Sequence, residues 1–351
     1  MTRPRALMLV SARVDDELRR EVAIGARPRP EYLLLEELHG VELLDWTRLP
    51  GGVDSRKAIG SAIHVLTALR RLPAADVIFS DGEHVGIPLA LALRGLRLDK
   101  PHLVIGHHLT SRSKASAFLR FRADRGMSRI LVHSQRQQDL AERDLGIPAD
   151  KLVVVPYYAD TEFWTPIRRV EEPLILAAGR EHRDYRTLAS ACADLDARVF
   201  IAAGSLHSPA ATESRPSQWP ANFELGFADY RALRELYARA SVVVVPIIET
   251  DFQAGITTLL EAMAMGKAVV STATRGRAAV IVDGINGLTV PAGDVCALRG
   301  AVARLLENPA ERARLGEEAR RTVVDGHGVE AYARQLAEHL GQLGGAQPLA
   351  A

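Results

Sequence analysis

The sequence predicts an α/β protein made of two Rossmann-like domains, each built around a parallel β-sheet. The chain has 351 residues, too many for one ordinary α/β domain and suited to two of roughly 150–180 residues. Short β-like runs alternate with helical patterns along the chain, as expected of βαβ units. The composition, 47% hydrophobic and 25% charged, is that of a globular protein with enough apolar side chains for two cores.

The predicted strands are short apolar runs. They cover residues 6–10, 77–80, 103–105, 130–133, 152–155, 174–178, 198–202, 223–225, 242–245 and 268–271. Between them, apolar residues three and four positions apart predict helices that cover the sheets. One such helix carries Ile59, Ile63, Leu66 and Leu69, which we expect to face a sheet. The tail over 298–340 is helical in pattern, with breaks near 308–309 and 325–328.

A change of composition marks the join between the domains. Residues 160–172 combine aromatic, proline and charged residues before the next apolar run. We therefore predict an N-terminal domain over 1–165 and a C-terminal domain over 166–325. A C-terminal helix over 326–343 and a flexible tail over 344–351 are expected to follow.

The charge balance and the cysteines limit the partners and the compartment. The 44 Lys and Arg against 43 Asp and Glu leave a net charge of +1, so a nucleic-acid partner is not expected. Cys192 and Cys296 stand alone, which argues against a disulfide framework and a structural zinc and favours a cytoplasmic protein. The first apolar run is too short for a signal peptide, and no run of about 18 apolar residues predicts a membrane helix.

Residues 242–267 carry the most informative pattern. A buried strand leads into an acidic loop, and Gly255 then opens an apolar helix. The first N–H groups of a helix have no intrahelical partner and the helix dipole favours negative charge, so this junction predicts an anion site that suits a diphosphate. Glu261 lies near the far end of the helix, where its carboxylate needs a partner such as ribose hydroxyls.

The same segment resembles the retaining glycosyltransferase family 4, glycosyl transferases group 1. The matching residues are Phe252, Gly255, 259–264, Gly266, 269–270, Gly276 and the glycine-flanked run 282–288. The resemblance implies the GT-B fold, in which two Rossmann-like domains face each other across a cleft and a C-terminal helix can cross back to the N-terminal domain. It also implies a nucleotide-sugar donor in the C-terminal domain, with an acceptor in the N-terminal domain.

By this resemblance, Glu261 takes the place of the family's second Glu and accepts hydrogen bonds from the donor ribose. The family's first Glu is replaced by Gln253, which can hydrogen-bond a sugar hydroxyl but carries no charge to stabilise an oxocarbenium ion. Glu249 or Asp251 could supply that carboxylate, or both could be solvated loop acids. The loop residues expected around the donor are Phe252, Ala254, Gly255 and Ile256.

Three arginines follow the strand over 174–178. Cations there can neutralise the leaving diphosphate, which the reaction needs because no DxD metal motif is evident. Arg180 and Arg183 are the expected catalytic cations, with Arg186 as the competitor of Arg183. The resemblance also makes Gly226 and Phe227 candidate contacts of the nucleotide base, although Phe227 could instead belong to the core.

The N-terminal half carries fewer matching residues. By spacing from Pro101, His107 takes the place of the family's cleft-facing histidine, with His108 as the alternative. Residues 11–17 replace the family's Gly-rich loop, so the acceptor, whether a small molecule, a glycan or a lipid-linked group, is not indicated. Residues 80–84 could add polar groups to the same site, or form an ordinary turn with Asp81 as a helix cap.

The expected function is metal-independent, retaining transfer of a sugar from a nucleoside-diphosphate sugar to an acceptor hydroxyl, with no cofactor. The alternatives are a catalytically silent nucleotide-sugar binder or partner activator, which the loss of the first Glu suggests, and a sugar-nucleotide epimerase. The six basic residues within 112–129 predict either a weak contact with a membrane surface or a solvated helix face.

Overall fold

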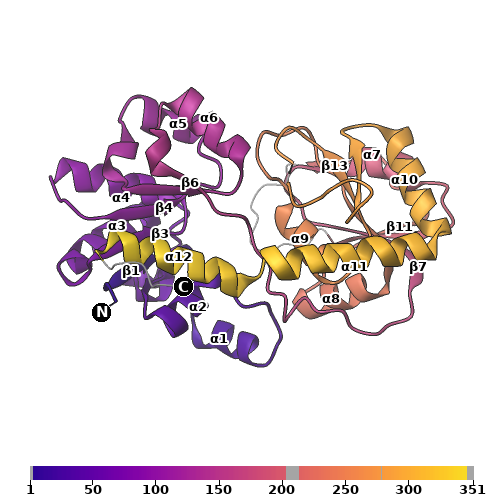
Figure 1. Cartoon of the computed structure of the whole chain (residues 1–351), viewed down its shortest axis with the longest axis horizontal. Helices are drawn as coiled ribbons and strands as arrows, with labels where there is room; N and C mark the ends of the chain where they lie inside the picture. The colour runs from indigo at the N-terminus through magenta and orange to yellow at the C-terminus, as the bar shows by residue number, and fades with distance from the viewer. Residues whose placement is uncertain (1–2, 203–212, 278, 346–351) are drawn as a thin grey trace. The chain divides into compact units, whose positions relative to one another are not determined.

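A computed structural model describes residues 3–202, 213–277 and 279–345 (Figure 1). The chain forms two compact units: unit 1 comprises Met1–Ile24, Arg29–Pro156 and Glu330–Ala351, and unit 2 comprises Gly25–Pro28 and Tyr157–Val329. Each unit contains a six-stranded parallel sheet with helices around it. The predicted fold class, two Rossmann-like domains, is confirmed. Part of the predicted tail, residues 346–351, lies outside the described residues.

Unit 1 is built on the sheet β2-β1-β3-β4-β5-β6, in which every neighbouring pair is parallel. Its strands are β1 Ala6–Leu9, β2 Glu42–Leu44, β3 Val77–Ser80, β4 His102–Ile105, β5 Arg129–Val132 and β6 Leu152–Val154. Its helices are α1 Asp16–Ala23, α2 Glu31–His39, α3 Ala58–Arg71, α4 Glu83–Gly95, α5 Arg112–Leu119, α6 Gln135–Leu145 and most of α12 Val329–Leu343. Short 3-10 turns are η1 Trp46–Arg48, η2 Pro50–Gly52, η3 Leu72–Ala74, η4 Ala123–Gly126 and η5 Ala149–Lys151.

Unit 2 is built on the parallel sheet β11-β9-β7-β12-β13-β14. These strands are β7 Glu172–Ala178, β9 Arg198–Ala202, β11 Phe223–Gly226, β12 Ala240–Val245, β13 Val269–Ala273 and β14 Leu288–Pro291. A second, two-stranded sheet pairs β8 Arg183–Asp184 with β10 Glu213–Ser214. The helices are α7 Tyr185–Cys192, α8 Tyr230–Arg239, α9 Ile256–Ala264, α10 Val295–Glu307 and α11 Pro309–Gly326.

In both sheets the chain reverses its direction of travel across the sheet once. In unit 1 the chain passes from β1 outward to β2 and then returns to β3 on the other side of β1. In unit 2 it passes from β7 through β9 to β11 and returns to β12 on the other side of β7. Such switch points, at the carboxyl ends of the strands, are where ligands bind in open α/β sheets. The pairs β1–β3 and β7–β12 therefore mark the place to look for a site in each unit.

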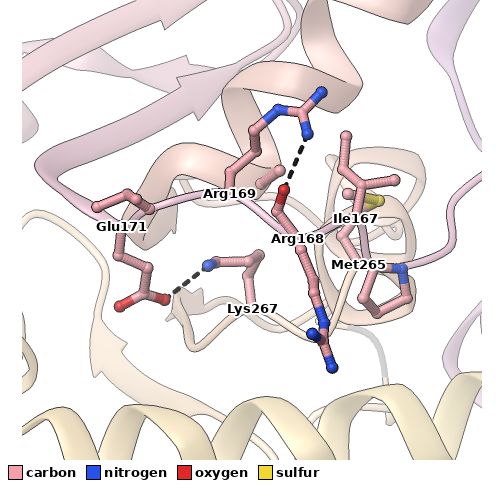
Figure 2. Close-up of a pocket in the computed structure, with 10 residues that line it drawn as sticks. Ile167, Arg168, Arg169, Glu171, Met265 and Lys267 are labelled. Carbon is pink, nitrogen blue, oxygen red and sulfur yellow. Dashed lines mark hydrogen bonds and ion pairs between the residues drawn. The ribbon is translucent and has the colours of Figure 1, made fainter.

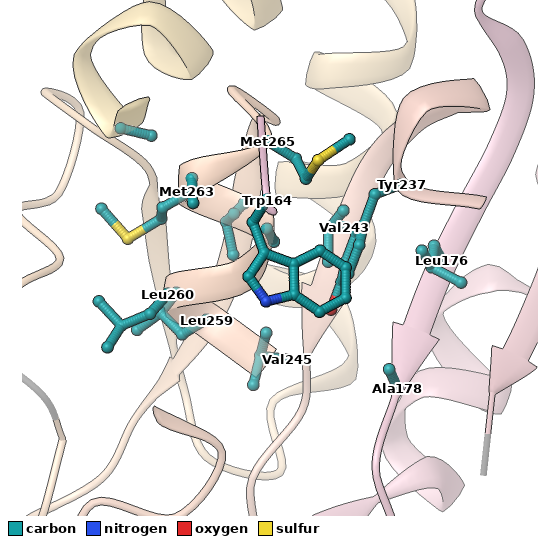
Figure 3. Packing of buried hydrophobic residues seen from close by; sticks show 14 of the residues in the cluster. Trp164, Leu176, Ala178, Tyr237, Val243, Val245, Leu259, Leu260, Met263 and Met265 are labelled. Atoms are coloured by element: carbon teal, nitrogen blue, oxygen red, sulfur yellow. The ribbon is translucent and has the colours of Figure 1, made fainter. Parts of the chain in front are cut away.

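The core around Trp164 holds α9 against the sheet of unit 2 (Figure 3). The indole is fully buried and packs edge-on against Phe163 at 4.8 Å and Tyr237 at 5.6 Å between ring centroids. Phe163 and Trp164 fall within our predicted N-terminal domain, yet they belong to the core of unit 2. The boundary between the units therefore lies between Pro156 and Tyr157, earlier in the chain than predicted.

The predicted orientation of α3 is confirmed for Ile63 and Leu69, which pack against the core, and is wrong for Ile59 and Leu66. Ile59 is 77% exposed and Leu66 is 55% exposed, whereas Ser61, His64 and Val65 are buried. His64 hydrogen-bonds the carbonyl of Leu44 in β2 at 2.7 Å. A buried polar side chain is tolerated when it finds such a partner, so the polar positions of α3 face the sheet and two apolar ones face outward.

At the C-terminus, the helix breaks lie where the sequence predicts them. Asn308 separates α10 from α11 and its side chain caps α11, with Pro309 at the first helical position. Arg129 of β5 donates hydrogen bonds to His339 and Gln342 of α12, each at 2.7 Å. The last helix thus packs on unit 1.

Candidate functional site

At the switch point of unit 2, the loops that follow β7 and β12 are joined. Asp184 donates a backbone hydrogen bond to the Pro246 carbonyl, and Ile248 donates one to the His182 carbonyl, both at 3.0 Å. Arg183 and Ile247 form an antiparallel bridge at the same place. These contacts bring the predicted arginine loop beside the loop that opens α9.

Arg183 lies buried between these loops. Its Nε donates to the Ala178 carbonyl at 2.9 Å, and its two Nη groups donate to the Glu181 carbonyl at 2.7 Å and to Thr258 Oγ1 of α9 at 3.1 Å. Burial lowers the pKa of the Arg183 guanidinium from its usual value, but an arginine stays protonated at neutral pH. The structure therefore places a fixed positive charge near the first turn of α9.

Two glycines make room for this guanidinium. Gly179 and Gly255 both adopt positive φ, at +95° and +75°. A Cβ at Gly179 would lie 2.3 Å from Arg183 Nη2, and one at Gly255 would lie 2.7 Å from Ile247 Cδ1 and 3.3 Å from Arg183 Nη1. Gly255 is the N-cap of α9 and offers no side chain to its free N–H groups. This helix N-terminus is thus available to an anion.

Glu261 is buried on the inner side of α9. Its Oε2 accepts a hydrogen bond from the hydroxyl of Tyr237 in α8 at 3.2 Å. Burial raises the pKa of Glu261 to about 8, although the nearby Arg183 charge and the Tyr237 hydrogen bond act in the opposite direction. The carboxyl group is therefore mostly protonated at neutral pH, and a ligand that stabilises its charged form would shift this balance.

Gln253 lies in the loop just before Gly255. Its Oε1 is buried and finds no hydrogen-bond partner among the described residues. A buried acceptor without a partner is unfavourable, so the amide oxygen is suited to receive a hydrogen bond from a ligand. The other two acids of the loop are occupied, because Glu249 and Asp251 both contact the exposed Arg275, at 3.3 Å and 3.4 Å. Which of the two predicted alternatives holds for these acids stays a prediction.

The remaining loop residues surround this point. The Phe252 ring packs edge-on against His182 at 4.9 Å between centroids, and the Phe252 backbone passes so close to Gly276 that a Cβ there would lie 2.3 Å from its N. Ala254 packs against the apolar core, and Ile256 is buried at the start of α9. Phe252, Ala254 and Ile256 thus fix the shape of the loop around Gly255.

The other predicted donor residues differ in exposure. Arg180 is half-buried, and its Nε is buried without a hydrogen-bond partner in the part of the chain that the structure describes. Arg186 is exposed on the first turn of α7. Gly226 ends β11, and a Cβ there would lie 2.6 Å from the Phe200 ring. Phe227 is 59% exposed, so the alternative that it belongs to the core is wrong.

In unit 1, His107 follows β4 at the carboxyl edge of the sheet. Its Nε2 contacts the Asp81 carbonyl at 3.0 Å, and its own carbonyl accepts a hydrogen bond from Gln137 at 2.6 Å. The backbone N–H of His108 donates to the buried carboxylate of Glu83 at 2.6 Å, and Lys114 pairs with the same carboxylate at 3.2 Å. The predicted histidine therefore lies among polar side chains from the neighbouring strand ends.

Asp81 does not cap α4, contrary to the alternative raised from the sequence. The N-cap of α4 is Gly82, which has no side-chain hydrogen bond. The carboxylate of Asp81 instead crosses to the end of β1, where it accepts hydrogen bonds from the N–H and the hydroxyl of Ser11, each at 2.5 Å. Sequence patterns missed this contact because it joins residues 70 positions apart.

A separate pocket of about 710 Å³ lies at the opposite, amino edge of the sheet of unit 2 (Figure 2). It is lined by residues just before β7 and β13, and Lys267 there pairs with Glu171 at 2.8 Å. None of the predicted site residues lines it. Within the described ranges, no group of three His, Cys, Asp or Glu residues could hold a metal ion, and no helix is both long and apolar enough to cross a membrane.

Two parallel sheets with polar side chains at their switch points define the class of two-Rossmann-domain proteins. The Glycosyltransferase Family 4 model matches residues 9–163, and the Glycosyl transferases group 1 model matches residues 172–308. These matches cover both units, and the chain belongs to glycosyltransferase family 4, group 1. The resemblance seen in the sequence is confirmed.

Two curated relatives match part of the chain. D-inositol 3-phosphate glycosyltransferase of Xylanimonas cellulosilytica is 30% identical over 224 residues, which are 55% of this chain and 52% of that protein. Alpha-D-kanosaminyltransferase of Streptomyces kanamyceticus is 26% identical over 238 residues, 61% of this chain and 60% of that protein. The chain thus spans between half and two thirds of the length of the curated relatives it matches.

Solved structures share the fold. Sucrose-phosphate synthase of Thermosynechococcus elongatus superposes with a TM-score of 0.72 at 19% identity, over 98% of this chain and all of that one. The Anabaena protein HepE in complex with UDP superposes with a TM-score of 0.70 at 15% identity, over 96% of this chain and all of that one. At these identities the likeness shows the fold alone.

Proposed function

We propose that this chain is a retaining glycosyltransferase that moves a sugar from a nucleoside-diphosphate sugar to an acceptor hydroxyl, without a metal ion. The observation that carries the proposal is the switch point of unit 2, where the buried Arg183 guanidinium lies near the uncapped N-terminus of α9. The guanidinium and the helix N-terminus both carry positive charge, and together they are best suited to bind a diphosphate.

The residues take the following roles in this proposal. The N–H groups near Gly255 donate hydrogen bonds to the diphosphate, as does Nε of Arg180, which has no partner among the described residues. Arg183 holds the two loops in place, and its positive charge near the first turn of α9 adds to the attraction for the diphosphate. Glu261 accepts hydrogen bonds from the ribose, in competition with the Tyr237 hydroxyl.

The chemistry needs no protein nucleophile. As the sugar–phosphate bond breaks, negative charge builds on the leaving diphosphate, where the two arginines and the helix dipole stabilise it. The acceptor hydroxyl attacks from the same face of the sugar, so the anomeric configuration is kept, and its proton passes to the leaving phosphate. Gln253 hydrogen-bonds a sugar hydroxyl through its buried Oε1. Positioning and charge stabilisation are then the protein's whole contribution.

The relatives suggest the first probes. HepE has been solved with UDP and glucose and with UDP-glucose, so UDP-glucose is the first donor to test. The relative named D-inositol 3-phosphate glycosyltransferase makes D-inositol 3-phosphate the first acceptor. A cytoplasmic location completes the proposal, since both Cys192 and Cys296 are free thiols.

A nucleotide panel tests the donor site. UDP, GDP, ADP and dTDP are added separately, and the melting temperature of the chain is followed. One of them should raise the apparent stability by about 2.7 kcal/mol when it is present at 100 times its dissociation constant. No shift with any nucleotide would contradict the proposal. Binding without consumption of the matching sugar donor would favour the catalytically silent alternative.

Arg180→Ala should lower turnover of the donor at least tenfold with little loss of stability, because the contact strengthens as charge builds on the leaving group. Arg168→Ala is the matched control, since Arg168 is exposed and lines the pocket at the opposite edge of the sheet. Equal turnover in the two variants would remove Arg180 from the site.

Arg183→Lys, which keeps the charge and loses part of the hydrogen bonding, should lower both turnover and stability.

The proposal includes a weak contact between residues 112–129 and an anionic lipid surface. Leu119 and Phe121 are 56% and 58% exposed and lie next to Arg120 and Arg122, a combination of apolar and basic side chains that suits an interface. Co-sedimentation with phosphatidylserine vesicles, but not with phosphatidylcholine vesicles, is expected, and it should be lost in Phe121→Glu. Equal sedimentation with both lipids would contradict this part of the proposal.

A further inference from the structure

The switch point of unit 1 carries a hydrogen-bonded chain of three side chains from two neighbouring strand ends. Ser11 follows β1, Asp81 follows β3, and His84 lies on the first turn of α4. The Asp81 carboxylate accepts both the N–H and the hydroxyl of Ser11, each at 2.5 Å. The Ser11 oxygen in turn contacts Nε2 of His84. This chain lies where ligands bind in open α/β sheets.

The order of the hydrogen bonds fixes the state of the histidine. Burial raises the pKa of Asp81 to about 6, so above that pH the group is an acceptor-only carboxylate. The one hydroxyl proton of Ser11 is then used by Asp81, and the Ser11 oxygen faces His84 as an acceptor. Nε2 of His84 must therefore carry the proton, which leaves Nδ1 with its lone pair. Burial also lowers the pKa of His84 to about 4, so the ring is neutral.

A glycine lies against the His84 ring. A Cβ at Gly82 would lie 3.1 Å from His84 Nδ1 and 3.6 Å from His107 Cδ2. No hydrogen-bond partner of Nδ1 occurs among the described residues. A side chain at Gly82 would therefore crowd the His84 ring, whereas the glycine leaves Nδ1 accessible to a hydroxyl group that donates to it.

The network joins the ends of β1 and β3, because Asp81 accepts the backbone N–H of Ser11 as well as its hydroxyl. Asp81 precedes the N-cap Gly82 and does not cap α4, and a half-buried carboxylate is unfavourable unless it is fully hydrogen-bonded. A polar group maintained in this way at a strand end is typical of a residue that orients another. Here the oriented group is the His84 imidazole.

We propose that His84 receives, through Nδ1, the hydroxyl group of the acceptor that takes the sugar, and that Ser11 and Asp81 are positioning residues that hold its tautomer. This inference rests on the proposed function, since it assigns the acceptor side of the same reaction. The acceptor is then a hydroxylated molecule that donates a hydrogen bond at the switch point of unit 1. His84 orients this hydroxyl.

Two measurements on the full chain test the inference. The first is the ¹⁵N spectrum of the histidines at pH 7.5, which reports the tautomer of His84 without any substrate. We expect the Nε2–H form in the wild type and loss of that preference in Ser11→Ala. Ser61→Ala is the matched control, because the Ser61 hydroxyl bonds only the backbone carbonyl of His84, at 2.7 Å. An Nδ1–H tautomer in the wild type would overturn the inference that Ser11 and Asp81 hold the tautomer of His84.

The second measurement is consumption of UDP-glucose with D-inositol 3-phosphate or water as the acceptor. His84→Ala should lower the rate by about 100-fold, as expected for loss of a group that hydrogen-bonds the reacting hydroxyl. His84→Gln should recover part of it through its amide oxygen, and Asp81→Asn should raise the acceptor KM more than it lowers kcat. Nucleotide-induced thermal shifts should stay unchanged in all three. A His84→Ala variant that keeps the wild-type rate would overturn the inference.

The two failures can be told apart. If no nucleotide shifts the melting temperature and the wild type consumes no donor, the proposed function fails. The tautomer of His84 then decides alone whether Ser11 and Asp81 position its ring. If nucleotides bind and donor is consumed while His84 substitution has no effect, the proposed function stands and the assignment of His84 fails.

Discussion

At the scale of single residues, Glu261 combines a buried position with a ligand role that needs it ionised. Burial raises its pKa to about 8, and among the described residues only Tyr237 donates a hydrogen bond to it. Ribose hydroxyls would supply further hydrogen bonds to the charged form. Nucleotide binding and ionisation of Glu261 should therefore be linked.

The linkage predicts the effect of pH on stability. The ordinary pKa of 4.5 applies to the unfolded chain, so between about pH 4.5 and pH 8 the folded state holds a proton that the unfolded state has released. The contribution of Glu261 to stability is therefore lost as pH rises through this range. Relative to Glu261→Gln, the free energy of unfolding of the wild type should fall by a few kcal/mol between pH 5 and pH 8, at about 1.4 kcal/mol per pKa unit. Parallel curves in urea titrations of the two proteins would contradict the pKa shift.

By the resemblance, Gln253 stands where the family has its first Glu. If its buried Oε1 accepts a hydrogen bond from a sugar hydroxyl, Gln253→Glu should keep the fold and change the rate or the choice of donor, because the two side chains differ in charge and donor capacity but little in size. Consumption of a panel of sugar donors by both proteins measures this. An unchanged donor profile would show that position 253 does not touch the sugar, and activity only in the Glu variant would show that the natural site is silent.

At the scale of elements, the loop-to-helix junctions position the site. The junction at Gly255 is the one that a substitution tests most directly. Gly255→Ala combines a positive φ with a Cβ placed 2.7 Å from Ile247. It should destabilise the chain by more than the roughly 1–2 kcal/mol of left-handed strain and weaken nucleotide binding. Gly284→Ala is the control, because Gly284 has φ +71° and nothing within 4 Å of its Cβ position. Equal melting temperatures for the two variants would mean that the junction is not tightly packed.

Much of the strand pattern could be predicted from the sequence, and the exceptions have physical reasons. The strands over 77–80 and 198–202 are predicted to the residue, because both are short, mainly apolar runs that the fold buries. β2 was missed because only Gly40 and Val41 separate its three residues from the leucine-rich helix α2. β14 was missed because it is an edge strand that ends in Pro291, a residue that argues against a strand.

The site was predictable in unit 2 and much less so in unit 1. In unit 2 the key residues from Gln253 to Glu261 follow one another along a loop and a helix, so spacing alone relates them. Ser11 and Asp81 meet only because β1 and β3 are neighbours in the sheet. The burial of Arg183 was also not predicted, because its partners Ala178 and Thr258 come from separate elements.

At the scale of the whole molecule, the proposed function assigns the donor to unit 2 and the acceptor to unit 1. Unit 2 carries the features that suit a nucleoside diphosphate, and unit 1 carries a polar network at the equivalent point of its own sheet. Family membership covers both units. The account therefore requires that donor binding depend on unit 2 residues and acceptor use on unit 1 residues.

The most direct test of the central claim is to follow the reaction of the wild type with UDP-α-glucose and other α-linked sugar nucleotides by ¹H NMR, before the released sugar mutarotates. Retaining transfer predicts that one donor is consumed and that the new product, or free sugar when water is the acceptor, first appears as the α anomer. The β anomer appearing first would contradict retention. If no nucleotide binds and no sugar donor of the panel is consumed, sugar transfer itself would be contradicted.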